Sequence, residues 1–386
     1  TYQFFIEPPK ITIPEFFSKR FGDKKNILSL IAGLVILVFF VPYTASGFNA
    51  CGTLFSSLFG VDYFTAMVVS AIVIVAYTTL GGFLAASTTD LIQSIVMTVA
   101  LVVVVGFGIN YAGGWDNVVV NANSMPGFLE FFNTYDPSTN ASTPYNALTV
   151  ASTLAWGLGY FGMPHILLRF MAINDKNKLK TSRRIATVWV FISMAVAILI
   201  GVVGSAAVKN GTIALDNANS QRIIIEIAKL ISGNGAIFAI VAGVILAGIL
   251  AATMSTSDSQ LLAAASAVSQ NIVKEFFHKN LSQKTSMLVA RLTVIVIAIV
   301  GVIWAKDEGS VFEIVSFAWA GFGAAFGPVV LFALFWKRTN KWGALAGMVV
   351  GGTMIFVWKY AIAKLGGVFA IYELLPAFIL ASVAIV

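Results

Sequence analysis

The chain contains 386 residues, of which 58% are hydrophobic and only 11% are charged. A soluble domain of this size cannot hide so much apolar surface, because soluble proteins are typically about 45–50% apolar, so we expect the chain to lie in a lipid bilayer. The single cysteine, Cys51, excludes an internal disulfide, the two histidines are too few for a histidine-based metal centre, and the net charge of +7 is interpreted as a membrane-orientation signal rather than as nucleic-acid binding.

Runs of about 20 apolar residues predict membrane-spanning helices rather than barrel strands, which would alternate polar and apolar positions. About ten such spans are expected, at Ile27–Ala50, Tyr63–Leu80, Leu91–Tyr111, Leu148–Phe170, Ile185–Val208, Ile237–Val268, Met287–Ala305, Val311–Trp336, Gly343–Ala361 and Tyr372–Val386.

The basic residues predict which ends of these spans face the cytoplasm. Most of the 24 Lys and Arg residues fall in the segments on the same side as Thr1, which is therefore taken as the cytoplasmic side. The chain then forms one transmembrane domain, 1–386, with a cytoplasmic lead-in at 1–25 and external loops at 112–147 and 209–235.

The first predicted span is interrupted by the polar segment 42–47, PYTASG. Proline removes a backbone donor from a helix and disturbs it locally. Tyr43 is expected to reach a cavity inside the bundle.

Asp90 follows Ser87, Thr88 and Thr89 at the cytoplasmic start of the third predicted span. Aspartate is well suited to cap a helix start, and this is the favoured interpretation. An acidic position on the route of an ion to the cytoplasm is a compatible alternative.

The segment 156–165, WGLGYFGMPH, lies within a predicted span and ends in proline and histidine. Its GxGxxG spacing follows no strand, so a nucleotide-binding loop is excluded. The dense glycines predict a broken helix, which survives at membrane depth only where it lines a cavity or is buried in protein. Trp156 and Tyr160, one turn apart, are candidates for the wall of a small-molecule pocket, with simple packing as the open alternative.

The segment 246–259, LAGILAATMSTSDS, places four polar residues in an apolar span. An aspartate at the centre of a spanning helix costs about 2.5–3.5 kcal/mol to insert, so it normally faces a partner, a cavity or an ion. Single serines in such helices commonly bond to their own backbone. Three hydroxyls beside Asp258 favour a cation site instead, formed by Ser255, Thr256, Asp258 and Ser259, to which a second segment must add oxygens.

The segment 318–328, AWAGFGAAFGP, is rich in small residues that permit close helix packing. No Ser-His-Asp arrangement, CxxC, HExxH or Walker A motif occurs in the sequence, so an enzyme is not expected.

Several segments resemble the sodium/solute symporter family, most closely its sodium/proline symporters. They lie in the same order along nearly the whole chain, at 12–16 (TIPEF), 81–85 (GGFLA), 156–169 (WGLGYFGMPHILLR), 252–256 (ATMST), 317–331 (FAWAGFGAAFGPVVL) and 343–348 (GALAGM).

The resemblance implies an all-α membrane protein with a LeuT-like core, a five-plus-five inverted repeat followed by extra C-terminal helices. By the same comparison the chain is an N-terminally truncated fragment that lacks the first three helices, including the first core helix, whose unwound middle contributes to the sodium and substrate sites. The second repeat, 148–336, is expected to be complete.

The resemblance also implies roles for individual residues. Ala252 (carbonyl), Ser255 and Thr256 match a sodium site, while Tyr43, Trp156, Tyr160 and Pro164 match positions linked to proline binding. Asp90 matches an aspartate of sodium entry or of a second sodium site, to which Asp258 and Ser259 also correspond. The aspartate at 258 departs from the serine of some relatives, so the number of ions stays open.

These inferences predict a secondary active transporter of the plasma (inner) membrane that imports L-proline with Na⁺ as the coupling ion, without an organic cofactor or a nucleic-acid partner. The alternatives are a sodium symporter for another amino acid, a carboxylate or a sugar, and a symporter-like membrane module of a sensor protein.

Overall fold

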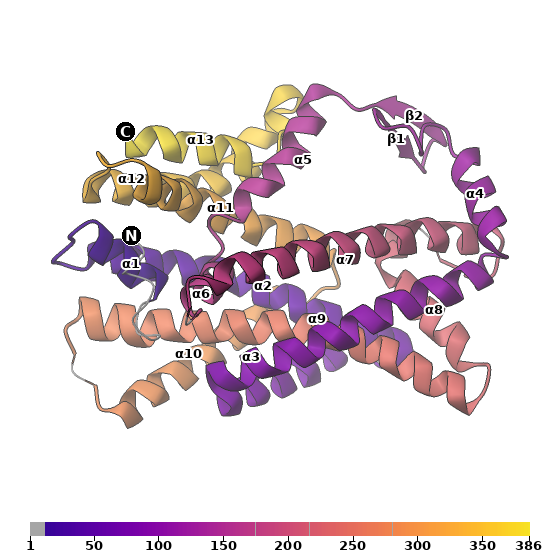
Figure 1. Ribbon diagram of the computed structural model, residues 1–386, viewed down its shortest axis with the longest axis horizontal. Coiled ribbons are helices and arrows are strands. Elements are labelled where there is room, and N and C mark those ends of the chain that lie inside the picture. The colour runs from indigo at the N-terminus through magenta and orange to yellow at the C-terminus, as the bar shows by residue number, and fades with distance from the viewer. Residues whose placement is uncertain (1–11, 174, 216, 280) are drawn as a thin grey trace.

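The computed structural model describes residues 12–173, 175–215, 217–279 and 281–386, and leaves the side chains of residues 81–87 and 217–218 undescribed. The first eleven residues of the predicted lead-in therefore lie outside the described residues. Most long helices run along the longest axis of the molecule, and the described ends of the chain lie together at one end of the bundle (Figure 1).

The chain enters the bundle through a short buried helix, α1 (Ile13–Arg20). The Thr12 hydroxyl accepts a hydrogen bond from the backbone N–H of Glu15 at 3.3 Å and caps the helix. Phe16 and Phe17 are buried, and the Phe17 ring lies 5.6 Å from that of Phe326. The described part of the lead-in is thus packed on the bundle. The long helix α2 (Ile27–Phe59) follows.

The next helix, α3 (Tyr63–Tyr111), has a continuous helical backbone but is not straight. Val73 and Met254, in α9 (Ala236–Ser266), line the same cavity, whereas a Cβ on Gly248, also in α9, would lie 2.5 Å from Ala100. A straight helix would separate residues 73 and 100 by about 40 Å. The two halves of α3 therefore both reach the same short stretch of α9, as expected for two separate spans.

The remaining elements follow in chain order. They are α4 (Trp115–Ser124), β1 (Asn133–Asp136), β2 (Ala141–Pro144), α5 (Ala147–Gly159), α6 (Pro164–Met171), α7 (Lys178–Lys209), η2 (Asn217–Arg222), α8 (Ile223–Ser232), α9, η3 (Ala267–Phe276), α10 (Gln283–Trp304), α11 (Val311–Phe335), α12 (Lys341–Val357), η4 (Trp358–Ile362), η5 (Ala363–Leu365), η6 (Gly367–Ala370) and α13 (Leu374–Ile385). Strands β1 and β2 form an antiparallel hairpin in which Asn133 pairs with Pro144.

Within the described residues, eight helical segments are long and apolar enough to cross a membrane, and two shorter apolar helices lie at Ala147–Phe161 and Leu374–Ile385. These ten segments overlap the ten ranges expected from hydropathy. The predicted span Leu148–Phe170 is broken into α5 and α6 at residues 160–163. The glycine-rich segment therefore does interrupt its helix, as its composition predicts.

The core of the bundle lies around α2 and α11. Phe39 and Phe40 of α2 and Phe322 and Phe326 of α11 are almost completely buried. The rings of Phe40 and Phe322 are 4.5 Å apart. Helix α11 therefore lies in the centre of the bundle rather than facing lipid.

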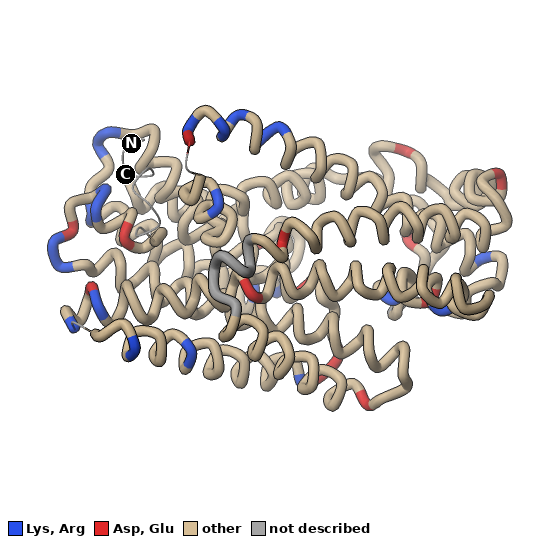
Figure 2. Tube along the Cα trace, turned by 60° about the horizontal axis from the view of Figure 1, so that its bottom comes forward, with Lys and Arg blue, Asp and Glu red and all other residues tan. Residues whose placement is uncertain are grey.

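Charge is distributed unevenly along the bundle. Lys and Arg gather at the end where the chain termini lie, as Figure 2 shows. Elements α4, β1, β2 and α8 lie at the opposite end (Figure 1). In α8, Ile227 and Ile231 are buried, so this amphipathic helix is docked on the bundle. By the positive-inside rule, the end that carries the termini is predicted to be the cytoplasmic one.

Candidate functional site

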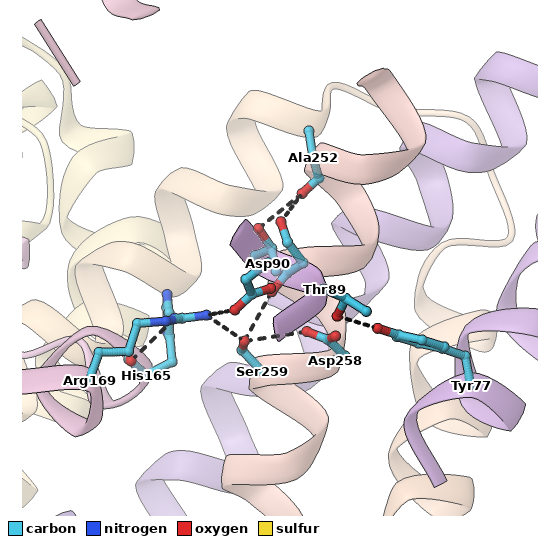
Figure 3. A network of polar contacts seen from close by, with 10 residues as sticks. Tyr77, Thr89, Asp90, His165, Arg169, Ala252, Asp258 and Ser259 are labelled. Atoms are coloured by element: carbon cyan, nitrogen blue, oxygen red, sulfur yellow. Dashed lines mark hydrogen bonds and ion pairs between the residues drawn. The ribbon is translucent and has the colours of Figure 1, made fainter. Parts of the chain in front are cut away.

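The polar turn of α9 brings three oxygens together. The hydroxyls of Ser255 and Thr256 both donate hydrogen bonds to the carbonyl oxygen of Ala252, at 3.2 and 3.1 Å (Figure 3). The backbone bonding that the sequence left as an alternative is therefore present. A hydroxyl that donates its hydrogen retains acceptor lone pairs, however, so the same turn also presents oxygens that can coordinate a cation.

A second polar group lies one turn further along α9, toward the basic end of the bundle. The Ser259 hydroxyl lies 3.0 Å from the carbonyl oxygen of Ser255 and 3.3 Å from Oδ1 of Asp258. Arg169 of α6 donates a hydrogen bond to the Ser259 hydroxyl at 2.9 Å and forms an ion pair with Asp90 of α3. Figure 3 shows these side chains converging from three elements.

The interpretation of Asp90 as a helix cap is wrong. The backbone of α3 is helical on both sides of Asp90, and Asp62 provides the N-cap by accepting a hydrogen bond from the N–H of Thr65 at 3.0 Å. Asp90 instead projects into the cluster at α9. Its pairing with a distant arginine could not be read from neighbouring residues in the sequence.

The two carboxylates of this cluster are incompletely satisfied. Asp258 is fully buried, and its Oδ2, like Oδ1 of Asp90, has no hydrogen-bond partner among the described residues. The two carboxylates lie close enough to repel each other, and Arg169 is close enough to attract Asp258.

The break between α5 and α6 gathers the residues that the resemblance linked to substrate. Pro164 starts α6, where its missing N–H breaks no helical bond. The ring of His165 lies 5.9 Å from that of buried Tyr43, so α2 meets α6 at this point. Tyr160 is half exposed, and its ring stands edge-on to Trp319 of α11 at 4.7 Å.

Trp156 is held in an aromatic stack. Its ring is stacked with those of Phe312, Trp319 and Tyr372, at 5.3, 5.5 and 5.9 Å. The indole N–H of Trp319 donates a hydrogen bond to the carbonyl oxygen of Trp156 at 2.9 Å. The structure thus gives Trp156 a packing role, and the stack borders the same break as Tyr160.

The glycines of the break are required by the approach of α11. A Cβ on Gly159 would lie 1.9 Å from the indole nitrogen of Trp319, and a Cβ on Gly162 would lie 2.1 Å from the carbonyl oxygen of Phe322. Because the two small-residue segments pack against each other, Gly159, Gly162 and Met163 are buried, whereas Tyr160 and Phe161 of the same break remain exposed.

An apolar cavity of about 320 Å³ lies apart from this site, between α2, the first half of α3 and α9. Its lining residues Leu250 and Met254 are on the face of α9 opposite Ala252 and Ser255, because each residue turns a helix by about 100°. This cavity is not part of the oxygen site.

Sequence reasoning missed Arg169 and Trp319 as site residues. Arg169 lies near the end of the predicted span Leu148–Phe170, and Trp319 lies in the small-residue segment 318–328. Both lie within the quoted family-like segments, but nothing in the linear sequence pairs them with α9 or with Trp156.

A helical bundle with a polar turn beside a broken helix defines a multi-pass membrane transporter, and comparison with known proteins identifies its family. A sequence model of the sodium:solute symporter family matches residues 2–351, and the chain belongs to this family. It is 40% identical over 377 residues to the osmoregulated proline transporter OpuE of Bacillus subtilis, covering 97% of this chain and 73% of that protein. It is 39% identical over 381 residues to the sodium/proline symporter of Escherichia coli, covering 97% and 72%.

A solved structure has the same fold. The substrate-bound, outward-open structure of a Na⁺-coupled sialic acid symporter matches with a TM-score of 0.72 and 18% identity, over 97% of this chain and 76% of that one. The predicted all-α, LeuT-like fold and the membrane-transporter class, as opposed to an enzyme, are confirmed.

Proposed function

We propose that this chain carries out Na⁺-coupled import of L-proline across the plasma membrane by alternating access. Relatives between 36% and 41% identical over most of the chain are named as sodium/proline symporters. The observation that carries the proposal is the oxygen turn at Ala252, Ser255 and Thr256, at membrane depth in a member of this family.

In this proposal the Ala252 carbonyl and the hydroxyls of Ser255 and Thr256 supply part of the Na⁺ shell. Neutral oxygens are suitable ligands for a hard monovalent cation. A single helical turn cannot surround an ion, so the remaining oxygens come from another segment. Na⁺ bound between the two would stabilise the outward-facing state.

Asp90, Asp258 and Ser259 form a candidate second cation position or entry route. The unpartnered carboxylate oxygens support it, because a buried polar group without a partner is costly and a cation would satisfy it. The number of ions moved per cycle depends on whether this position fills.

In this proposal the transported L-proline binds at the α5–α6 break, near Tyr43, Trp156, Tyr160 and Pro164. The aromatic stack around Trp156 supports an apolar wall for a small ring. Each positive charge that enters down a potential of about 100 mV releases about 2.3 kcal/mol, enough to concentrate a solute tens of times.

The test is uptake of radiolabelled proline by proteoliposomes that contain the full-length transporter. An inward Na⁺ gradient should drive accumulation, and replacement of Na⁺ by K⁺ should abolish it. Uptake driven equally by K⁺ or by a proton gradient would refute sodium coupling. Sodium-driven uptake of another amino acid, a carboxylate or a sugar in place of proline would favour the substrate alternative, and Na⁺ or proline binding without transport would favour a sensor module.

A further inference from the structure

Arg169 joins three elements that are far apart in the sequence. It lies near the end of α6, and its guanidinium donates to Asp90 of α3 and to Ser259 of α9. A third, longer bond reaches the carbonyl oxygen of His165 at 3.4 Å within α6 itself. The Arg169 side chain is 45% exposed, whereas that of Asp90 is only 18% exposed, so the arginine reaches inward from the more open side of the pair.

Arg169 lies on the side of the oxygen turn that faces the predicted cytoplasmic end. Ser259 lies one helical turn beyond Ser255, and α9 runs from there toward the end of the bundle that carries the termini (Figure 1), which is the end where Lys and Arg gather (Figure 2). The guanidinium therefore stands between the turn that presents Ser255 and Thr256 and the cytoplasmic end. An ion that left this turn along the same face of α9 toward the cytoplasm would meet it.

A guanidinium and a metal cation compete for the same oxygens here. Both are positive, and both favour the carboxylate of Asp90 and the hydroxyl of Ser259. While Arg169 holds these groups, its guanidinium occupies the oxygens that a passing cation would need as ligands. Once Arg169 moves away, the cluster is left with two carboxylates and attracts a cation strongly.

Helix α6 is short and separate from the helix before it. It contains eight residues, and the interruption at residues 160–163 separates it from α5. The bonds from Arg169 fasten it to α3 and α9. Their loss would remove the polar links from α6 to α3 and α9, while buried His165 and Met171 still pack α6 on the bundle.

We propose that Arg169 is the cytoplasmic gate of the ion pathway, a positioning residue that closes the inner side while it holds Asp90 and Ser259 and opens it when it releases them. The inference rests on the proposed sodium-coupled function, because it assigns the inner barrier of that pathway. It predicts that loss of the guanidinium shifts the transporter toward inward-open states.

The experiment measures access from the cytoplasm in the full-length transporter. A cysteine replaces Gln93, which lies one turn deeper in α3 than Asp90 and has a buried side-chain oxygen without a described partner. The background carries Cys51→Ser, which removes the native cysteine of this chain. A membrane-impermeant maleimide is applied to inside-out vesicles with no Na⁺ present, with and without Arg169→Gln.

With Arg169→Gln, the cysteine at position 93 should react with the maleimide about fivefold faster, which is the low end of the range for coupling between sites. The same substitution should raise the external Na⁺ concentration needed for half-maximal uptake. Arg169→Lys keeps the positive charge but loses the forked guanidinium, so its labelling rate should fall between those of the unsubstituted protein and Arg169→Gln. If Arg169→Gln fails to reach the membrane, Arg169→Lys takes its place in the test. Arg183→Gln, at an exposed position of α7 at the same end, should match the unsubstituted protein.

Unchanged labelling and unchanged sodium dependence in Arg169→Gln would overturn the gate. Faster labelling in a protein whose uptake does not need Na⁺ would uphold the gate and refute the sodium function instead. A rise in labelling that Arg183→Gln reproduces would show a nonspecific effect of removing positive charge, and would also overturn the proposal.

Discussion

The hydroxyl of Thr256 is the most direct test of the oxygen turn at the scale of a single residue. Thr256→Ala removes one of its oxygens and should raise the Na⁺ concentration for half-maximal proline uptake about tenfold, the effect of roughly 1.4 kcal/mol of lost binding. Thr256→Ser keeps the hydroxyl and should restore most of the sodium affinity.

The control for this substitution is Thr253→Ala in the same helix. Thr253 makes the same type of bond, to the carbonyl oxygen of Ile249 at 3.1 Å, but packs toward Gly47 of α2. Its loss should leave sodium dependence near that of the unsubstituted protein. Equal sodium dependence in Thr256→Ala and the parent would remove Thr256 from the ion shell and leave its hydroxyl with a backbone-bonding role only.

Trp156 separates substrate binding from packing. Trp156→Ala should weaken apparent proline affinity more than apparent sodium affinity, measured as two half-saturation constants in the same vesicles. Trp156→Phe retains an aromatic face against Phe312 and Trp319 and should lose less proline affinity. A parallel loss of both affinities in Trp156→Ala would mean that the residue only supports the fold.

At the scale of elements, the contact between the α5–α6 break and α11 depends on the absence of side chains. Gly162→Ala should lower the thermal unfolding temperature of the detergent-solubilised protein and reduce its yield, because the new Cβ meets the backbone of Phe322, which cannot move aside as a side chain can. A cost of about 1–3 kcal/mol is typical of such overpacking.

The matched control is Gly157→Ala, five residues earlier in the last turn of α5. A Cβ at Gly157 meets nothing within 4 Å. Since alanine favours helix over glycine by up to about 1 kcal/mol, this variant should be as stable as the parent or more so. Comparable destabilisation by both alanines would show that the break tolerates no change at all, and that α11 is not the cause.

At the scale of the whole molecule, the distribution of charge predicts the orientation of the bundle in the membrane. A cysteine placed at Ser138, in the turn between β1 and β2, should react with an impermeant maleimide from outside intact cells, and a cysteine at Lys337, after α11, should react only in inside-out vesicles. The reverse pattern would invert the assignment of the ion pathway and place Arg169 at the outer side.

The sequence by itself determined that the chain lies in a lipid bilayer, where its ten apolar segments fall, that a helix breaks within residues 156–165, and which family the chain resembles. Each of these depends on composition or on residues adjacent in the chain. It also singled out Ser255, Thr256 and Asp258, since polar groups are conspicuous against an apolar background. What only the tertiary structure decided is which distant groups meet. Three features arise where helices cross: the pairing of Arg169 with Asp90 and Ser259, the stack of Trp156 with Phe312, Trp319 and Tyr372, and the pairing of Asp90 in place of a helix-cap role. The hydropathy of one helix does not indicate which residues of another helix will contact it.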